Sequence, residues 1–229
     1  MKTVLITGAA GHLGKVTVLT FLENGYRVIA VGNHPEPPQP ALANKPYHFF
    51  QVNLSEEAQT TVFSQKLLLE FPELEAVLFL AGGFGMGNLT ATGSEELHQM
   101  FALNFETAFY LSRSVIKHLQ DKGYGRLVYI GARPALDPAA GKNMIAYTLS
   151  KTLLLKLAEL INAETRGTNV VASVVVPSTL DTPVNRSAMP NADPSGWVKP
   201  EAIAELILFI CSEKGMALRE PVYKIYNNA

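Results

Sequence analysis

The sequence predicts an α/β protein built on a doubly wound, parallel, seven-stranded sheet with helices on both faces. Short apolar runs alternate with helical patterns along all 229 residues, as a parallel sheet requires. The first run, Val4-Leu5-Ile6, is apolar throughout, as in a strand buried on both faces, and leads into a glycine-rich turn and a helix. Apolar residues make up 48% of the chain and charged residues 17%, which fits one globular domain over 1–229.

Strands and helices can be placed from these patterns. The strands are expected at residues 4–6, 27–31, 47–52, 76–80, 126–130, 170–176 and 222–226. The main helices are expected to begin after the first glycine-rich turn, at Ser55, at Ser94, near Tyr147 and near Pro200. Ser55 is predicted to cap its helix, which should end near Glu70 because Pro72 bars its continuation. Residues 35–46 should form a proline-rich surface connection, and 84–93 a flexible, glycine-rich one.

Composition and charge exclude several classes of protein. The net charge of −1 gives no electrostatic reason to expect DNA, RNA or an anionic membrane as a partner. The single cysteine, Cys211, excludes an internal disulfide and a cysteine-rich zinc site, and we expect no bound metal. The N-terminus reaches glycine too soon for a signal peptide, and no apolar run is long enough to span a membrane. A cytoplasmic protein is expected.

The turn from Thr7 to Gly14 is the first candidate binding site. A glycine-rich turn can be merely structural, but this one lies between a strand and a helix. In that arrangement backbone N–H groups and the helix dipole point at a phosphate group. Candidate contacts with a dinucleotide cofactor are therefore Gly8, Ala10, Gly11, His12, Leu13 and Gly14.

The end of the second strand bears on the choice of cofactor. Gly32-Asn33-His34 stands where an acidic residue would hold the ribose of NAD or a basic residue the 2′-phosphate of NADP, and neither is present. Nothing there repels a phosphate, and Asn33 and His34 can donate hydrogen bonds to one, so we expect NADP or NAD with a slight preference for NADP. Asn53 and Leu54, after the third strand, are further candidate contacts.

Two polar or glycine-rich features follow the fourth strand. Ala81-Gly82-Gly83 would let a cofactor ring or ribose approach the backbone closely. Asn104 lies within the long helix expected from Ser94 to Leu119, in otherwise apolar surroundings. A buried asparagine needs partners, so it is either a satisfied core group or the organiser of a site.

Tyr147 and Lys151 are four residues apart in a helical pattern that ends near Arg166, so both should lie on one face of that helix. An ammonium group favours the ionised form of a neighbouring phenol, so the pKa of Tyr147 should fall towards the working pH. The pair would then suit proton transfer. The alternative is a surface tyrosine that happens to lie near a surface lysine.

These features together resemble the short-chain dehydrogenase/reductase family in order and spacing. The resemblance covers essentially the whole chain, and Pro177–Pro183 is similar to the family's loop over the nicotinamide, which adds Pro177, Thr179, Leu180 and Thr182 as cofactor contacts. It implies a Rossmann-type fold, a small-molecule substrate and hydride transfer with NAD or NADP. Tyr147 would be the proton donor, Lys151 would lower its pKa and hold the nicotinamide ribose, and Asn104 would order a water in the proton relay. Thr182 would contact the cofactor's carboxamide or phosphates.

Two positions depart from the family pattern. Its short members usually carry T-G-x-x-x-G-x-G, whereas here Gly11 precedes His12. That spacing is typical of longer members such as nucleotide-sugar epimerases, whose extra C-terminal domain 229 residues cannot hold. The family also has Ile-Ser-Ser after the fifth strand, and this chain reads Ile130-Gly131-Ala132. The hydroxyl that polarises the substrate is therefore missing unless a neighbour, such as Arg133 through its guanidinium, supplies a donor.

Dihydropteridine reductases, which resemble this chain more closely in places, also lack that serine. The similar stretches are Ala81–Gly83 with the following glycines, 131–137, and 179–190 through to Trp197. The resemblance implies a quinonoid dihydropterin or a quinone-like molecule as hydride acceptor. Those enzymes carry an acidic residue where this chain has Gly32, so their preference for NADH does not carry over.

A non-catalytic dinucleotide-binding protein, acting as a redox sensor or scaffold, is the alternative. Ala132 favours it, whereas a sensor has no need of the paired Tyr147 and Lys151. A homodimer or homotetramer is expected in either case. The apolar residues of the Tyr147 helix occupy an arc of roughly 160°, wider than the stripe of roughly 100° that packing on one sheet requires. These residues are Leu153, Leu154, Leu157, Ala158, Leu160 and Ile161.

Overall fold

The computed structural model describes residues 1–35, 42 and 44–228, and its centre is the predicted parallel sheet. All neighbouring strands pair in parallel, in the order β3-β2-β1-β4-β5-β6-β7. The strands are β1 (Thr3–Thr7), β2 (Arg27–Gly32), β3 (Tyr47–Gln51), β4 (Leu74–Phe79), β5 (Gly125–Ile130), β6 (Val170–Pro177) and β7 (Val222–Ile225). The predicted doubly wound, seven-stranded fold is confirmed. Most of the predicted proline-rich connection lies outside the described residues.

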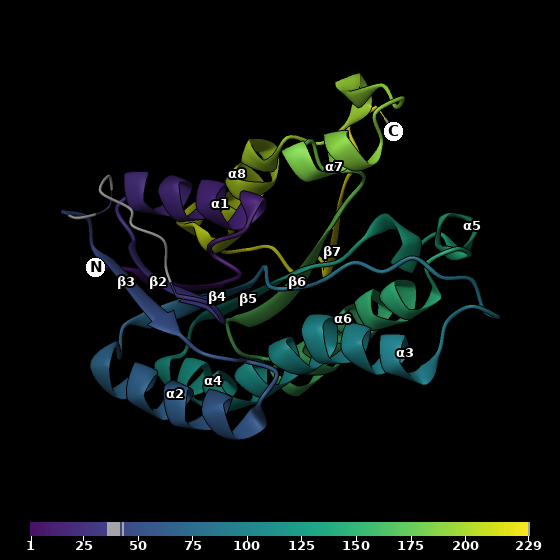
Figure 1. The fold of residues 1–229 in the computed structure, drawn as a ribbon. Helices are drawn as coiled ribbons and strands as arrows, with labels where there is room; N and C mark the ends of the chain where they lie inside the picture. The colour runs from purple at the N-terminus through teal and green to yellow at the C-terminus, as the bar shows by residue number, and fades with distance from the viewer. Residues whose placement is uncertain (36–41, 43, 229) are drawn as a thin grey trace.

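Helices cover both faces of the sheet (Figure 1). The longer ones are α1 (His12–Glu23), α2 (Glu57–Glu70), α3 (Ser94–Phe101), α4 (Thr107–Lys122), α6 (Ile145–Glu164) and α8 (Pro200–Cys211). Two short helices, α5 (Pro138–Gly141) and α7 (Pro183–Ala188), follow β5 and β6. In Figure 1, α1 and α8 lie above the sheet and α2, α4, α6 and α3 below it. Among the described residues, no helix combines the length and apolar character that crossing a membrane requires.

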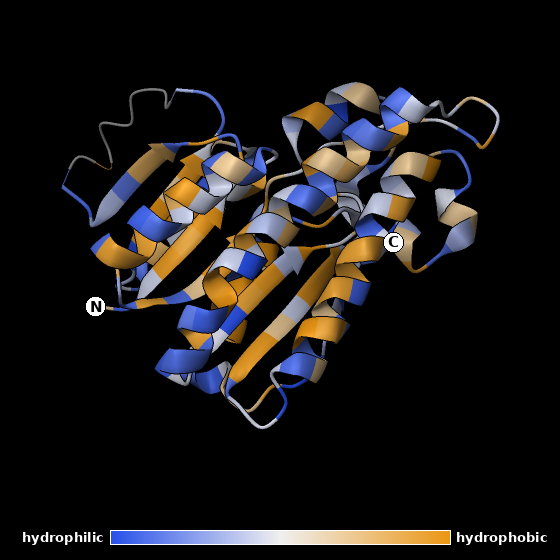
Figure 2. Cartoon of the chain, turned by 90° about the horizontal axis from the view of Figure 1, so that it is seen from below, coloured by the Kyte–Doolittle hydropathy of each residue, from blue (hydrophilic) through white to orange (hydrophobic). Residues whose placement is uncertain are grey.

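The core consists of two apolar layers, one on each face of the sheet, and Figure 2 shows the strands as largely hydrophobic. Successive side chains of a strand point to opposite faces. Accordingly, Leu5 packs in the layer between the sheet and helices α2, α4 and α6. Val4 and Ile6 pack in the layer between the sheet and helices α1 and α8. This is why the strands read as continuous apolar runs rather than alternating ones.

Two details of the helices differ from the prediction. Ser55 does not cap α2: residue Glu56 precedes the helix without a side-chain cap, and the Ser55 hydroxyl instead donates to Asn53 Oδ1 at 2.7 Å. The long helix expected from Ser94 is interrupted by a π-helical turn, Ala102–Glu106, before it continues as α4. Such turns insert an extra residue and often mark functional positions, and this one contains Asn104.

The order of the strands reverses between β1 and β4, which are neighbours in the sheet although β2 and β3 come between them in the chain. Ligands of open α/β sheets bind outside the carboxyl ends of the strands at such a point. The glycine turn after β1 and Ala81-Gly82-Gly83 after β4 therefore meet at this edge of the sheet.

Candidate active site

The turn between β1 and α1 is shaped for close contact with the end of β4. Gly8 has a φ of +64°, and a Cβ there would lie 2.7 Å from the backbone nitrogen of Ala81. A Cβ on Gly14 would lie 2.2 Å from Gly8 O, so α1 packs directly on the turn. Thr7, which the sequence prediction gave no role, accepts hydrogen bonds from Leu80 N and Ala81 N, both at 3.1 Å. The two glycine-rich segments are thus fastened together.

The start of α1 fits the phosphates of a dinucleotide. Gly11 occupies the cap position without a side-chain hydrogen bond, and the first turn carries no acidic side chain. The first backbone N–H groups of a helix have no partner within it, so an anion can accept from them here. Ala10, Gly11 and His12 are exposed at this point and Leu13 is partly buried, so these predicted contacts lie where a cofactor can reach them.

Asn104 joins three of the predicted features. Its Oδ1 accepts from Gly83 N at 2.9 Å, and its Nδ2 donates to Gly83 O at 3.1 Å and to Ser150 Oγ at 3.0 Å. A Cβ on Gly82 would lie 2.5 Å from Asn104 Oδ1 and 3.2 Å from Lys151 Nζ, so only glycine fits there. Both N–H groups of the buried carboxamide are thus used, and Asn104 links the segment after β4 to α6 within the predicted site.

Tyr147 and Lys151 lie on one face of α6, as predicted, with Lys151 Nζ 5.9 Å from the centre of the tyrosine ring. The predicted fall in the pKa of Tyr147 is wrong for this structure, because burial raises that pKa to about 12. Burial also lowers the pKa of Lys151 to about 8. The lysine ammonium donates to Ile130 O at 2.9 Å, and desolvation determines the direction of both pKa shifts. The phenol therefore stays protonated at neutral pH and can give up a proton.

Ala132 follows β5 beside these groups and is buried, so no hydroxyl stands at the place of the family's serine. Arg133, the next residue, does not supply a replacement donor. Its guanidinium lies over the ring of Tyr226, 5.5 Å from the ring centre, and its Nε is 3.7 Å from Asp137 Oδ2. The departure from the family pattern is thus uncompensated by Arg133 in this structure.

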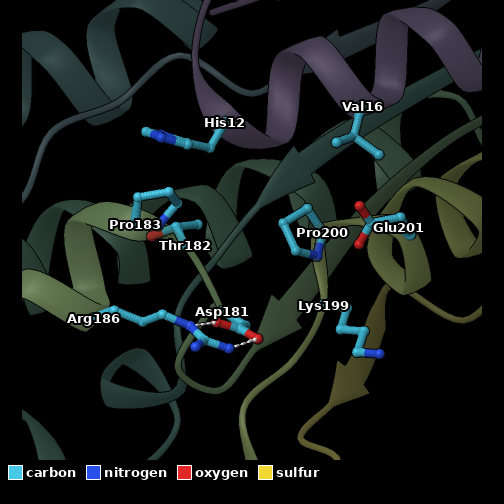
Figure 3. A pocket seen from close by; sticks show the side chains of 9 residues that line it. All are labelled: His12, Val16, Asp181, Thr182, Pro183, Arg186, Lys199, Pro200 and Glu201. Carbon is cyan, nitrogen blue, oxygen red and sulfur yellow. Dashed lines mark hydrogen bonds and ion pairs between the residues drawn. The ribbon is translucent and has the colours of Figure 1, made fainter. Parts of the chain in front are cut away.

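The segment after β6 approaches the start of α1. Thr182 is buried and caps α7, since its Oγ1 accepts from Asn185 N at 3.2 Å. His12 and Thr182 line a common cavity of about 370 Å³, in which Arg186 donates to both carboxylate oxygens of Asp181, at 2.6 and 2.9 Å (Figure 3). Pro177 ends β6, Thr179 O accepts from Val198 N at 2.8 Å, and Leu180 O accepts from Asn185 Nδ2 at 2.9 Å.

The remaining predicted contacts lie at the ends of β2 and β3. Asn33 and His34 are exposed after Gly32, where their side chains can meet a ribose or a phosphate. Asn53 Oδ1 accepts from Ser55 N at 3.2 Å, which fixes the turn after β3. Leu54 is buried in the core, so only its backbone can face a cofactor.

Besides Thr7, the sequence prediction missed Ser150 and Phe84. Ser150 is buried between Asn104 and the backbone of Tyr147, to whose carbonyl it donates at 2.8 Å. Its place just before Lys151 was the available signal. Phe84 follows Gly83 directly, and its ring packs edge-on against the ring of Tyr147, with 5.0 Å between the centres.

The comparisons with known proteins agree with this geometry. The chain is 29% identical over 232 residues to 2,3-dihydro-2,3-dihydroxybenzoate dehydrogenase of Escherichia coli (strain K12), covering 93% of this chain and 90% of that enzyme. It is 27% identical over 209 residues to the dihydropteridine reductase of Dictyostelium discoideum, covering 89% and 85%. Its fold matches that of ElxO with NADP bound, with a TM-score of 0.89 and 21% identity over 98% of this chain and 96% of the other.

The family model described as short chain dehydrogenase matches residues 2–193. This match spans most of the chain and includes the glycine turn, Asn104, Tyr147, Lys151 and Thr182. The chain therefore belongs to the short-chain dehydrogenase family of NAD(P)-dependent oxidoreductases.

Proposed function

We propose that residues 1–229 act as one domain that reduces a planar, conjugated ring compound, such as a quinonoid dihydropterin or a quinone, with NADPH or NADH. The observation that carries this proposal is the closeness of Lys151 to both Tyr147 and Gly82. Lys151 also donates to Ile130 O, two residues before the buried Ala132. The pair provides a proton, and the glycines admit a cofactor ring. The missing hydroxyl disfavours acceptors that need strong polarisation.

A dihydronicotinamide cofactor held by the glycine turn and Lys151 would supply the hydride. Tyr147 gives its phenolic proton to the acceptor, so the acceptor gains two hydrogens in all. Lys151, protonated below about pH 8 because burial lowers its pKa to about that value, holds the ribose hydroxyls of the cofactor. Asn104 Oδ1 accepts one hydrogen bond from Gly83 N and keeps a second lone pair, which can hold a water for the proton relay.

The class of acceptor follows from Ala132 and from the relatives. A carbonyl that takes hydride develops negative charge on oxygen, and removing one donor to such an oxyanion typically costs about 10²–10³-fold in rate. An acceptor that is already electron-poor depends less on that donor. The two relatives above are named for a dihydrodihydroxybenzoate and a dihydropteridine, both of which are ring compounds that differ by two hydrogens from a conjugated form.

Cofactor choice should be weakly selective, with NADPH slightly preferred. Asn33 and His34 are exposed at the end of β2 and can donate hydrogen bonds to a 2′-phosphate. Gly32-Asn33-His34 contains no carboxylate to repel that phosphate and no arginine to grip it. A preference for NADH above about tenfold, or about 1.4 kcal/mol, would contradict this assignment.

We further propose that the protein pairs with itself through the outer face of α4 and α6. Leu154, Ala158 and Ile161 face the core, but Leu160 is 61% exposed on the same helix, and Leu149 and Phe109 are also exposed. An apolar face of this kind on two adjoining helices favours a homodimer or, through a further contact, a homotetramer. Light scattering at micromolar concentration tests this, and a monomer would exclude it.

The function is tested by steady-state oxidation of NADPH and NADH with three acceptors: quinonoid dihydropterin, a simple quinone and an aliphatic ketone. We expect turnover with the first two, and its loss in Tyr147→Phe. Cofactor binding without turnover of any acceptor would instead indicate a non-catalytic dinucleotide-binding protein. If the aliphatic ketone were turned over as fast as the quinone, the proposed preference for conjugated ring compounds would be wrong.

A further inference from the structure

Phe84 is an exposed aromatic residue in contact with the proton donor. Its side chain is 61% exposed, although phenylalanine is among the residues most often buried. Its ring meets the ring of Tyr147 at 71°, with 5.0 Å between the centres. The two rings therefore form an edge-on aromatic pair, in which the tyrosine ring carries the phenol oxygen.

The backbone on both sides of Phe84 is held by hydrogen bonds at Gly83 and Gly87. Gly83 is held through both its N–H and its carbonyl by the carboxamide of Asn104. Gly87 N donates to Asn143 O at 2.8 Å, and Ile145 N donates to Gly87 O at 2.9 Å, at the start of α6. The glycine-rich segment is thus anchored to the same helix that carries Tyr147.

The glycines next to Phe84 serve this packing. A Cβ on Gly85 would lie 3.0 Å from Glu96 Oε1, and one on Gly87 would lie 2.7 Å from Thr92 Oγ1. The segment therefore packs against the side chains of Thr92 and Glu96, at and just before the start of α3, and a larger residue at either glycine would require those side chains to move. A contact residue held by a rigid backbone can select among ligands, which a loosely held one cannot do well.

We propose that Phe84 is a substrate-contacting residue, whose ring packs against the planar ring of the hydride acceptor and selects conjugated ring compounds over saturated ones. This rests on the proposed function, because it places the acceptor beside Tyr147. Phe84 exchanges no proton or electron: NAD(P)H supplies the hydride and Tyr147 the proton. Aromatic rings favour offset-stacked or edge-on contact with one another, whereas a saturated ring gains only from burial.

The test compares Phe84→Leu with a matched control, Phe209→Leu. Leucine keeps an apolar side chain but removes the ring, and Phe209 is another exposed phenylalanine, 43% exposed, on α8. The first measurement is the dissociation constant of oxidised pterin, which is planar and accepts no hydride here, for the complex of enzyme with NADP⁺. The second is the ratio of kcat/KM for a simple quinone to that for a saturated cyclic ketone.

We expect Phe84→Leu to weaken pterin binding and to lower the kcat/KM ratio, each by about tenfold, the scale of an aromatic contact of about 1.4 kcal/mol. Phe209→Leu should change neither. Equal pterin binding by the two variants would overturn the assignment. An equal fall in kcat/KM for the quinone and the ketone would also overturn the assignment, because that pattern means only that Tyr147 has been displaced.

The two proposals can fail separately. If the wild type reduces none of the acceptors but binds pterin in a way that depends on Phe84, the proposed function fails and the contact stands. If quinones are reduced and Phe84→Leu behaves as Phe209→Leu does, the function stands and the contact is wrong. If the wild type neither turns over a ring compound nor binds pterin, both are wrong.

Discussion

The carboxamide of Asn104 donates a hydrogen bond to the hydroxyl of Ser150 over 3.0 Å, and that hydroxyl donates in turn to the backbone carbonyl of Tyr147 over 2.8 Å. Asn104 and Ser150 are 1% and 0% exposed. The two bonds tie the π-helical turn, and through it Gly83, to the helical turn that carries Tyr147 and Lys151. We therefore propose that Ser150 positions Tyr147, the proposed proton donor.

Ser150→Ala should lower both stability and turnover. It removes the acceptor for one amide hydrogen of Asn104, and a lost buried hydrogen bond costs about 1–3 kcal/mol. The turn of α6 that carries Tyr147 loses its tie as well, so kcat should fall by about tenfold, with a smaller effect on cofactor binding. Urea unfolding and steady-state kinetics measure the two effects.

Ser114→Ala is the matched control for Ser150→Ala. Ser114 also donates to a carbonyl of its own helix, Tyr110 O at 2.8 Å, but it has no bond to Asn104. Its loss should leave kcat unchanged. A Ser150→Ala enzyme that is less stable but has wild-type kcat would show that the bond is structural only.

Tyr147→Phe should remove turnover and spare cofactor binding. The substitution deletes only the phenol oxygen, so the edge-on contact with Phe84 remains possible. General acid groups contribute about 10²–10⁴-fold to rate, and a loss of that size is expected in kcat. The dissociation constant for NADPH, measured by its fluorescence, should change by less than about threefold. More than half of the wild-type kcat would exclude Tyr147 as the donor.

Lys151→Met should make the protein more stable at pH 7. Burial lowers the pKa of Lys151 from an ordinary value of 10.5 to about 8, which corresponds to a penalty of about 3 kcal/mol for the charged form. The lost hydrogen bond to Ile130 O offsets about 1 kcal/mol of this. Unfolding by urea at pH 7 should therefore show a gain of about 1–2 kcal/mol.

The gain from Lys151→Met should shrink as the pH rises. Below about pH 8 the lysine is protonated in both states and the penalty is complete. Between about pH 8 and 10.5 the unfolded chain binds more protons than the folded one, so wild-type stability rises relative to the variant. Lys156→Met, at an exposed lysine of the same helix, should show neither effect. A variant less stable than wild type at pH 7 would contradict this account.

The sequence located the sheet well because each strand is a compact apolar run between turn residues. The predicted ends at 27–31 and 170–176 differ by one residue from β2 and β6. The π-helical turn around Asn104 could not be seen, because one extra residue leaves the surrounding pattern of apolar side chains helical. Ser55 was misjudged because α2 begins at Glu57, so Glu56 rather than Ser55 occupies the cap position.

The chemistry of the site was harder to predict than its residues. Spacing along a helix placed Tyr147 and Lys151 together, but their pKa values depend on burial and on where the ammonium points. That direction is set by Ile130 O, 21 residues away in the sequence. The role of Phe84 likewise depends on a contact across the fold, with a residue that a local pattern cannot identify.

Ala132→Ser should change the preference for acceptors. The wild type is expected to reduce quinonoid dihydropterin or a simple quinone at least about a hundredfold better than an aliphatic ketone in kcat/KM, or about 2.7 kcal/mol. Ala132 is buried beside the site, and Arg133 is engaged with Tyr226 and Asp137. A serine hydroxyl there can donate to a ketone oxygen as charge develops on it. The kcat/KM for ketones should then rise by about 10–10²-fold.

Quinones should respond much less to Ala132→Ser, by under about threefold, because their reduction already proceeds without that donor. Ala139→Ser is the control, since Ala139 lies seven residues further on and is exposed on α5. Both variants and the wild type are assayed side by side with the same cofactor. If the wild type reduces aliphatic ketones as readily as quinones, Ala132 does not determine the substrate class. If the serine leaves the ketone rate unchanged, the residue is not close enough to the acceptor oxygen to act on it.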